Sequence, residues 1–310
     1  MEYAYFDRKD RAKEMNKTLP WLDHGIALDL HMHTVVSDGT DTPAEILELV
    51  RKAGLKLFSI TDHDSIKAAG IVQALLKEGD PAFLSGVEFS CKDEEGKYHI
   101  LGYNFDPDSP AIVETVNFGH NLRMEKVKAR LDFLREEFGF VFPEDEINGL
   151  LAMDNPGKPH IGNMMVKHGY AESKEVAIRD YIDKLHLGTK YVRPEQAIQG
   201  ILNAGGIPVL AHPSYGSGDQ MILGKDMENR VVRLMEFGLQ GLEAFYSGFT
   251  LKLQTENLLL AEKYGLYVTA GSDYHGANKL IELGDIGIDG IPIPPQGMKR
   301  FLRDTLLKNA

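Results

Sequence analysis

The chain has 310 residues, of which 43% are hydrophobic and 26% are charged, and its formal net charge is -12. The length and balance are those of a globular protein, and the acidic charge argues against a long nucleic-acid groove, which would need a basic face. Cys91 is the only cysteine, which excludes an intramolecular disulfide and a cysteine-rich zinc site.

The N-terminal residues are charged and lack the apolar core of a signal peptide. The chain also has no apolar run of about 18 residues, the length needed to cross a membrane. We therefore expect a soluble cytoplasmic protein without a membrane partner. Residues 1–25 are expected to form a polar N-terminal arm that caps the surface, with an oligomer contact as the alternative role.

A β-α-β unit is expected to follow the arm. Residues 27–33 and 55–60 are apolar runs that predict two strands. Between them, Thr42-Pro43-Ala44-Glu45 supplies an N-cap, a proline at the first helical position and a capping-box glutamate. Gly54 marks the end of that helix.

A hairpin and a helical segment come next. Residues 82–90 and 97–104 flank the charged segment 92–96, which has the length of a hairpin loop, so the two strands should be antiparallel. In residues 106–190 the pattern changes to long polar sequence with apolar residues at helical spacing, as in residues 112–138. This part predicts an inserted helical subdomain that covers the site as a lid.

Strand-like sequence resumes after the insertion. Residues 207–212, 241–245 and 266–271 are apolar runs, each preceded by helix-like sequence. Seven strand segments in all predict the α/β class, with a distorted (β/α)7 TIM-like barrel built from residues 26–105 and 191–310.

Clusters of histidine and acidic residues end or interrupt these apolar runs. Because barrel enzymes keep their chemistry at strand ends, the recurrence predicts a multinuclear metal site. A single His-x-His on a strand would be equally consistent with packing. The clusters are Asp29-Leu30-His31-Met32-His33, Thr61-Asp62-His63-Asp64, Gly86-Val87-Glu88, Tyr98-His99-Ile100, Ala211-His212-Pro213 and Gly271-Ser272-Asp273-Tyr274-His275.

In order and spacing these clusters, together with Ser37-Asp38-Gly39, resemble the motifs of the PHP (polymerase and histidinol phosphatase) family. The likeness extends from about residue 26 to the C-terminus. It is greatest to the stand-alone bacterial phosphoesterases of that family, which include phosphatases of nucleoside mono- and bisphosphates. The resemblance implies hydrolysis of a phosphate monoester of a small nucleotide, a 5'-monophosphate or 3',5'-bisphosphate, by a metal-bound hydroxide.

The resemblance also implies a set of metal ligands. Nitrogen and carboxylate ligands without thiolates suit divalent Zn, Mn or Fe, and three ions are expected. Three divalent ions would offset the acidic ligands and favour a phosphate. The implied ligand sets are His31, His33, Glu88 and Asp273 for the first ion, Glu88, His99 and His160 for the second, and Asp38, His63 and His275 for the third.

Further residues have expected roles around the metals. His212 has no place in the three sets and is expected to protonate the leaving alkoxide, with a core-capping ring as the alternative. Lys158 stands where similar phosphatases carry an arginine for the phosphate, and it supplies the charge without the bidentate fork. Asp29, Asp62 and Asp64 are expected to orient ligand imidazoles.

Several other functions are consistent with the same residues. They are a 5'-3' exonuclease on short oligonucleotides, a histidinol-phosphate-type phosphatase, a hydrolase of amides or lactones, and a non-catalytic metal-binding module. The expected partner is a small phosphorylated substrate, and no signal in the sequence bears on the oligomeric state.

Overall fold

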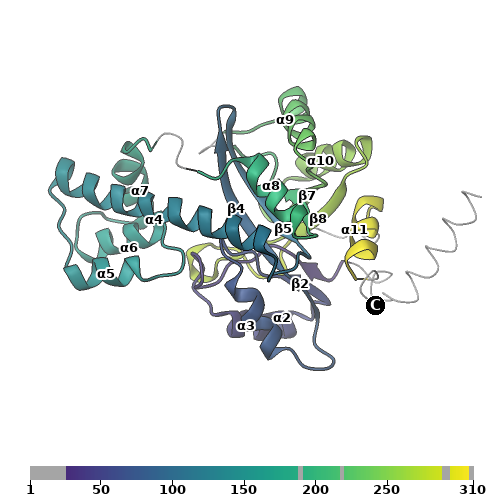
Figure 1. The fold of residues 1–310 in the computed structure, drawn as a ribbon, viewed down its shortest axis with the longest axis horizontal. Coiled ribbons are helices and arrows are strands. Elements are labelled where there is room, and N and C mark those ends of the chain that lie inside the picture. The colour runs from purple at the N-terminus through teal and green to yellow at the C-terminus, as the bar shows by residue number, and fades with distance from the viewer. Residues whose placement is uncertain (1–25, 188–190, 217–219, 288–293, 307–310) are drawn as a thin grey trace, which may run out of the picture.

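The computed structural model of the chain describes residues 26–187, 191–216, 220–287 and 294–306. The expected N-terminal arm, residues 1–25, lies outside the described residues. The described strands form a three-stranded sheet, β1-β2-β3, and a five-stranded sheet, β4 to β8, with helices around them (Figure 1). No helix among the described residues has the length and apolar character needed to cross a membrane.

The three-stranded sheet is parallel. It consists of β1 (Leu28–Asp29), β2 (Leu57–Ser59) and β3 (Ala82–Leu84). Helix α2 (Pro43–Ala53) joins β1 to β2, and α3 (Lys67–Leu75) joins β2 to β3.

Both ends of α2 lie where the capping residues of the sequence predict them. The Thr42 hydroxyl accepts the Glu45 N–H at 3.2 Å, and the Glu45 carboxylate accepts the Thr42 N–H at 2.8 Å. Gly54 ends the helix with φ 71°, a left-handed conformation that glycine adopts readily. The predicted β-α-β unit and its capping residues are confirmed.

The five-stranded sheet begins with an antiparallel hairpin of β4 (Gly86–Asp93) and β5 (Gly96–Tyr103), in which Asp93 lies opposite Gly96. The turn is therefore shorter than the expected loop 92–96. Strand β6 (Ile207–Leu210) is antiparallel to β5. Strands β7 (Gly241–Tyr246) and β8 (Tyr267–Gly271) then continue parallel to β6.

The single strand expected at residues 82–90 is wrong, because the chain changes sheets at residue 85. Its first part is β3, beside β2, and its second part is β4, beside β5. A Cβ at Gly86 would lie 2.2 Å from the Ser59 Oγ and 2.5 Å from the Ile60 oxygen. The crossing is thus close enough that only glycine fits it.

The two sheets meet through isolated contacts. On one side the Leu30 N–H donates to the Ala270 oxygen at 3.0 Å, and on the other side His63 forms a parallel bridge with Glu88. The described residues thus contain eight strands in two sheets rather than seven in one closed sheet. An α/β fold is confirmed, and a closed barrel is not.

Helices cover the outer side of the five-stranded sheet. Helix α8 (Pro194–Asn203) packs on β4, β5 and β6, α10 (Leu251–Lys263) on β7, and α11 (Gln296–Leu306) on β8. Helix α9 (Gly224–Glu236) precedes β7.

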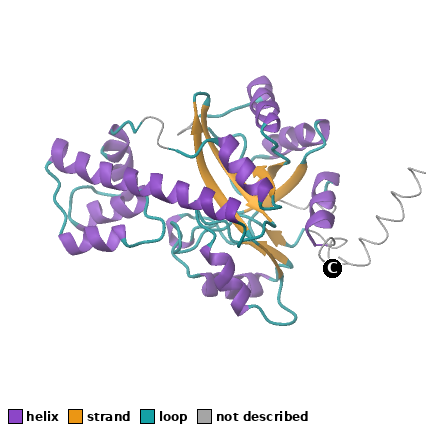
Figure 2. Cartoon of the chain, in the orientation of Figure 1, coloured by secondary structure: helices purple, strands orange, loops and turns teal. Residues whose placement is uncertain are grey.

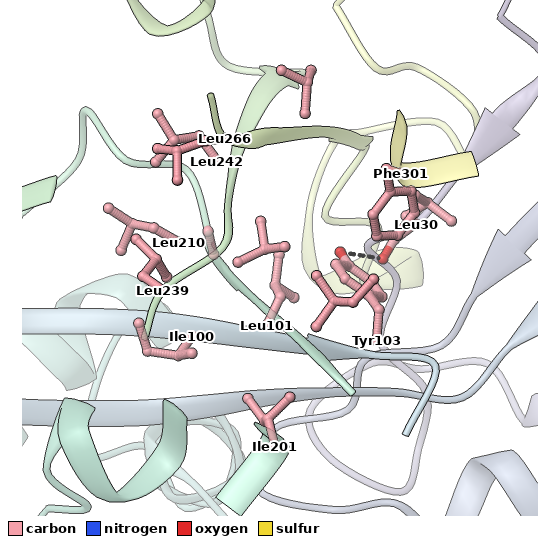
Figure 3. Close-up of a cluster of buried hydrophobic side chains, with 14 of the residues drawn as sticks. Leu30, Ile100, Leu101, Tyr103, Ile201, Leu210, Leu239, Leu242, Leu266 and Phe301 are labelled. Atoms are coloured by element: carbon pink, nitrogen blue, oxygen red, sulfur yellow. Dashed lines mark hydrogen bonds between the residues drawn. The ribbon is translucent and has the colours of Figure 1, made fainter. Parts of the chain in front are cut away.

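A hydrophobic core fills the space between this sheet and its helices, with Ile100, Leu210 and Phe301 all 0% exposed. Within this core the Tyr103 hydroxyl donates to the Leu30 oxygen at 2.9 Å (Figure 3). The bond ties β5 to the segment after β1, where the first histidine cluster begins.

The helices expected in residues 106–190 are present. They are α4 (Pro110–Phe138), α5 (Glu144–Leu151), α6 (Lys158–Lys167) and α7 (Lys174–Asp180), followed by the 3-10 turn η2 (Ile182–Lys184). They form a lobe of helices and loops (Figure 2). This lobe has its own buried cluster, which includes Leu134 and Met165. The near end of α4 packs on α8 and β4, so this long helix joins the lobe to the sheet, and Lys174 of α7 adds a contact to Asn278. Its boundaries as a subdomain stay a prediction.

Candidate metal centre

The Glu88 carboxylate lies among several imidazoles where the two sheets meet. Glu88 is on β4 and is 1% exposed. Its Oε2 atom lies 3.3 Å from His31 Nε2, 3.1 Å from His33 Nε2 and 3.1 Å from His63 Nδ1. Metal–ligand bonds of about 2.0–2.2 Å place neighbouring ligand atoms roughly 3 Å apart, so these separations suit ligands that share an ion.

The second oxygen of Glu88 faces a different pair of rings. Its Oε1 atom lies 2.9 Å from His99 Nδ1 and 3.3 Å from His212 Nε2, and these two nitrogens are 3.2 Å apart. Glu88 therefore has one oxygen in each of two groups of nitrogens, as a bridging carboxylate would.

A third group of ligand atoms surrounds Asp38. Its Oδ1 lies 3.3 Å from His275 Nε2 and its Oδ2 lies 3.9 Å from His63 Nε2. The rings of His33 and His275 stack with their centroids 4.0 Å apart. The structure thus brings together Asp38, His63 and His275, the three residues expected around one ion.

Asp273 has its two oxygens in different surroundings. Its Oδ1 lies 3.5 Å from His31 Nε2 and 3.3 Å from His33 Nε2. Its Oδ2 accepts from the Tyr246 hydroxyl at 3.1 Å and from the Lys279 ammonium at 2.5 Å. The oxygen that faces the histidines is therefore oriented by contacts to the other oxygen.

These residues fit divalent metal ions. The Nε2 atoms of His31 and His33 and the Nδ1 atom of His63 are buried and have no hydrogen-bond partner among the described residues. Unpaired buried polar atoms are costly, and a bound cation would satisfy them. Three groups have all their ligand atoms within 4.8 Å of one another: His33, Asp38, His63 and His275; His31, His33 and Glu88; and His63, Glu88 and His99.

The charges of the metal-free cluster also favour cations. Burial alone would raise the pKa of Glu88, but the charges of His99, His31 and His63 outweigh burial and hold that pKa well below its ordinary value. Burial alone would lower the pKa of His33, yet its contacts with Asp273 and Glu88 raise it to about 9. The carboxylates of Asp38, Glu88 and Asp273 are thus ionised. His31 and His33 hold protons where a metal ion would bind, whereas burial lowers the pKa of His63 to about 3.

Glu243 is a residue of this site that sequence reasoning missed. It lies on β7 and is 0% exposed. Its Oε1 is 2.9 Å from His31 Nδ1, and its Oε2 accepts the backbone N–H of His212 at 2.7 Å. A carboxylate on the far nitrogen fixes the orientation of a ligand histidine. The feature of the sequence that could have identified Glu243 is a charged residue between the apolar residues Leu242 and Ala244 of a predicted strand.

The acidic residues expected to orient imidazoles form no direct bond to a ring in the described part of the chain, and Asp62 reaches the His33 ring only through the Ser37 hydroxyl. Asp29 accepts from the backbone N–H groups of Ser272 at 2.9 Å and Gly284 at 2.8 Å. These bonds hold the segment after β8 against the segment after β1.

Two more carboxylates hold neighbouring segments in the same way. Asp62 accepts from the Thr34 N–H at 2.7 Å and from the Ser37 hydroxyl at 2.6 Å. Asp64 pairs with Arg123 of α4. Short polar side chains near the ligands thus position backbone, because buried N–H groups must find acceptors.

His160 and Lys158 lie at the start of α6. The His160 Nδ1 accepts the Gly157 N–H at 3.0 Å, and His160 belongs to none of the three groups formed by described residues. The Lys158 ammonium pairs with Asp183 in the helical lobe. The structure therefore places these two residues outside the cluster around Glu88, and their expected roles stay predictions.

A family model and several known proteins are similar to this chain. The family model described as PHP domain matches residues 29–192. A 3',5'-nucleoside bisphosphate phosphatase of Chromobacterium violaceum is 28% identical over 80% of this chain and 87% of its own. A phosphoribosyl 1,2-cyclic phosphate 1,2-diphosphodiesterase of Eggerthella lenta is 30% identical over 80% of this chain and 94% of its own. A 5'-3' exoribonuclease of Haemophilus influenzae is 27% identical over 83% and 92%.

A solved structure from Bifidobacterium adolescentis, assigned as a metal-dependent phosphoesterase, has a TM-score of 0.74 to this chain. It is 26% identical, and the match covers 91% of this chain and 98% of that one.

Proposed function

The chain belongs to the PHP domain family, and we propose that it is a metal-dependent hydrolase of phosphoric esters, with a phosphate monoester of a small nucleotide as its substrate. The observation that carries the proposal is the Glu88 carboxylate, whose two oxygens face two different groups of histidine nitrogens. The relatives named above all act on phosphoric esters, which supports the reaction class, and the named bisphosphate phosphatase supports a nucleotide.

The ligand groups have room for three ions in this proposal. Divalent Zn, Mn or Fe ions there would neutralise phosphate charge and lower the pKa of a bound water, which supplies the nucleophile. Asp273, through Oδ1, would complete the first set with His31, His33 and Glu88. Asp38, His63 and His275 would hold the third. The helical lobe would cover this centre, because Arg123 of α4 reaches Asp64 next to His63.

We further propose that His212 and His160 exchange the roles expected from the sequence. His212 Nε2 lies within 3.3 Å of Glu88 Oε1 and of His99 Nδ1, so it suits the second ligand set. His160 accepts a backbone N–H at Nδ1, which in the neutral ring leaves the proton on Nε2. A protonated nitrogen cannot bind a metal but can donate to a leaving oxygen. His160 is therefore the better proton donor.

A leaving-group comparison tests this exchange. His160→Asn should keep its metal. Its hydrolysis of a nucleoside monophosphate should slow about 10² to 10⁴-fold more than its hydrolysis of p-nitrophenyl phosphate, whose phenolate departs without a proton. His212→Asn should lose metal and slow both substrates alike. His186→Asn, at an exposed ring outside the site, is the control. The opposite pattern, with full metal content in His212→Asn and a selective loss there, would restore the original assignment.

The reaction class has a simpler test. Protein prepared with added Mn or Zn should release phosphate from p-nitrophenyl phosphate and from a nucleoside monophosphate, and a chelator should stop both reactions. Turnover that survives complete metal removal, or hydrolysis of amides in place of phosphoric esters, would contradict the proposal.

A further inference from the structure

Helix α4 carries a row of buried basic side chains. Arg123, Lys126 and Arg130 are 9%, 6% and 6% exposed and recur at helical spacing, so they share one face. Buried charges in proteins are normally paired. Arg123 meets this rule, because its Nε donates to Asp64 at 3.2 Å and its guanidinium also reaches the Ser90 hydroxyl.

The other two members of the row lack such a partner. Lys126 places its ammonium 3.8 Å from the centre of the Tyr191 ring, and in the described parts of the chain no carboxylate forms an ion pair with Lys126 or Arg130. Burial, together with the charges of Arg123 and Arg130, lowers the pKa of Lys126 to about 7. Lys158 is already paired with Asp183. The basic side chains around Lys126 thus outnumber the acidic ones.

The row starts beside the metal centre and leads away from it. Ser90, which Arg123 contacts, lies opposite His99 in the β4–β5 hairpin. At 1.5 Å per residue, Lys126 and Arg130 follow Arg123 by about 4.5 Å and about 10 Å along the axis of α4. Figure 1 shows α4 running from the sheet into the helical lobe.

A further unpaired polar group lies near the row. Asn155 is 1% exposed, and neither of its amide atoms has a partner among the described residues. It is two residues before Gly157, where an added Cβ would lie 3.5 Å from the Arg123 guanidinium. Within the part of the chain that the structure describes, Lys126 and Arg130 thus lack a carboxylate partner, and Asn155 has an unpaired amide. Together these groups could bind an anion that has several oxygens.

We propose that Lys126 and Arg130 bind a second phosphoryl group of the substrate, one that is not hydrolysed. This inference rests on the proposed function and narrows its substrate class to compounds with two phosphoryl groups. The second group is either the terminal phosphate of a nucleoside bisphosphate or the first phosphodiester of a 5'-phosphorylated oligonucleotide. Both present the same anionic oxygens to the two side chains.

Three substrates separate these sources: adenosine 5'-monophosphate, adenosine 3',5'-bisphosphate and 5'-phosphorylated diadenylate. We expect kcat/KM to be at least about tenfold higher for one of the two larger compounds than for the monophosphate, from charge-assisted bonds to the second group. A higher kcat/KM for the bisphosphate identifies the second group as a terminal phosphate. A higher kcat/KM for the dinucleotide identifies it as a phosphodiester. Equal kcat/KM for all three would overturn the proposal.

Matched variants locate the effect. Lys126→Met and Arg130→Met keep an unbranched apolar chain, and each should reduce severalfold the ratio of kcat/KM for the larger compound to kcat/KM for the monophosphate. Lys128→Met, at an exposed position of the same helix, should leave this ratio unchanged. An undiminished ratio in the Lys126→Met, Arg130→Met double variant would assign the second phosphoryl group to other residues and overturn the proposal.

Equilibrium binding makes the test independent of turnover. Calorimetry should show that adenosine 3',5'-bisphosphate or the dinucleotide binds the wild type more tightly than the monophosphate does, and that the double variant loses the difference. If the wild type turns over none of the three compounds, the proposed function fails, while the binding comparison still decides the role of Lys126 and Arg130. Binding without any such difference overturns that role.

Discussion

Glu88 organises the site because its two oxygens have separate partners. Oε2 faces His31, His33 and His63, and Oε1 faces His99 and His212. An isolated buried carboxylate would be strongly disfavoured, so its ionised state depends on these neighbours. The same interdependence makes single substitutions at the site informative.

Asp273→Asn should abolish turnover while the fold persists. The amide keeps the shape and can still accept from Tyr246 and Lys279 on one side, but the Oδ1 side loses the charge that would hold the first ion. We expect phosphatase activity to fall by more than about 100-fold, beyond the effect of losing an outer hydrogen-bond partner. Steady-state rates with saturating metal measure this. Asp108→Asn, on the exposed surface, is the control, and a near-wild-type rate for Asp273→Asn would exclude Asp273 from the ligands.

Glu243→Gln should weaken metal binding rather than abolish it. The amide preserves the volume but removes the negative charge from His31 Nδ1, so the imidazole becomes a weaker ligand. We expect metal affinity to fall by about 10 to 100-fold, with activity recovered at higher metal concentration. Metal titrations of chelator-treated protein measure this, and an unchanged titration curve would show that Glu243 has no influence on the metal.

Strand ends rather than strand interiors carry the unusual backbone of this protein. Asp64, His212 and Asp273 have φ angles of 49°, 28° and 59°, values that residues other than glycine rarely adopt. Each follows the end of a strand and lies in or beside the ligand cluster. Strained residues of this kind persist where surrounding contacts hold them, as Glu243 holds the His212 N–H.

Helix α4 carries both apolar and basic buried residues. Its apolar residues Val127, Leu131 and Leu134 belong to the buried cluster of the helical lobe, while Arg123, the first residue of the basic row, pairs with Asp64. A buried lysine without a carboxylate reduces stability, so the row is expected to lower the stability of the helix packing in the absence of substrate.

Lys126→Met should therefore stabilise the protein in a pH-dependent way. Lys126 has a pKa of about 7 in the folded chain and about 10.4 in an unfolded chain, so the unfolded state binds one more proton between these pH values. Wild-type stability then rises with pH over that window, and the penalty is fully present below pH 7. The surrounding charges are Arg123, Arg130, Lys158 and Asp64.

The measurement is the thermal midpoint of both proteins at pH 7 and pH 10. Lys126→Met should melt several degrees above wild type at pH 7, with a smaller difference at pH 10. Lys128→Met should match wild type at both values. A destabilised Lys126→Met variant at pH 7 would mean that the ammonium is stabilised by contacts stronger than the Tyr191 ring.

The candidate metal centre lies where the two sheets of the molecule meet. His31, His33 and His63 follow strands of the three-stranded sheet, Glu88 and His99 belong to the β4–β5 hairpin, and Asp273 follows β8. Backbone hydrogen bonds already join the two sides, such as Asp273 N–H to the His31 oxygen at 2.8 Å and Asp64 N–H to the Glu88 oxygen at 2.9 Å. Ions shared by ligands from both sides would add a further connection.

Metal removal should consequently lower the stability of the whole protein. Ions that bind the folded chain and not the unfolded chain stabilise it by mass action. We expect more than one metal equivalent per chain by elemental analysis, and a thermal midpoint that falls after chelation and recovers when Mn or Zn is returned. A stoichiometry that stays at or below one after reloading would contradict the multinuclear site, and an unchanged midpoint would show that the ions do not tie the sheets together.

Local features of the sequence predicted much of this protein correctly. Thr42, Glu45 and Gly54 define the ends of α2 because capping depends on contacts between residues only a few positions apart. Most of the strands were predicted for a similar reason, since apolar runs bounded by turn residues are local signals. The histidine and acidic clusters after β1, β2, β6 and β8 fit the rule that the ends of parallel strands gather at one edge, whereas Glu88 and His99 lie within the antiparallel hairpin.

Contacts between distant residues decided the rest. The chain changes sheets near Gly86 because of its approach to Ser59 and Ile60, which no pattern around residue 86 reveals. Glu243 is 212 residues away from the histidine that it orients, and His212 lies beside His99 only after β5 and β6 have paired. The sequence by itself thus determined which residue types could bind metal and which segments could be helices or strands. Only the tertiary structure decided which of those residues meet, because their distances depend on how the two sheets pack.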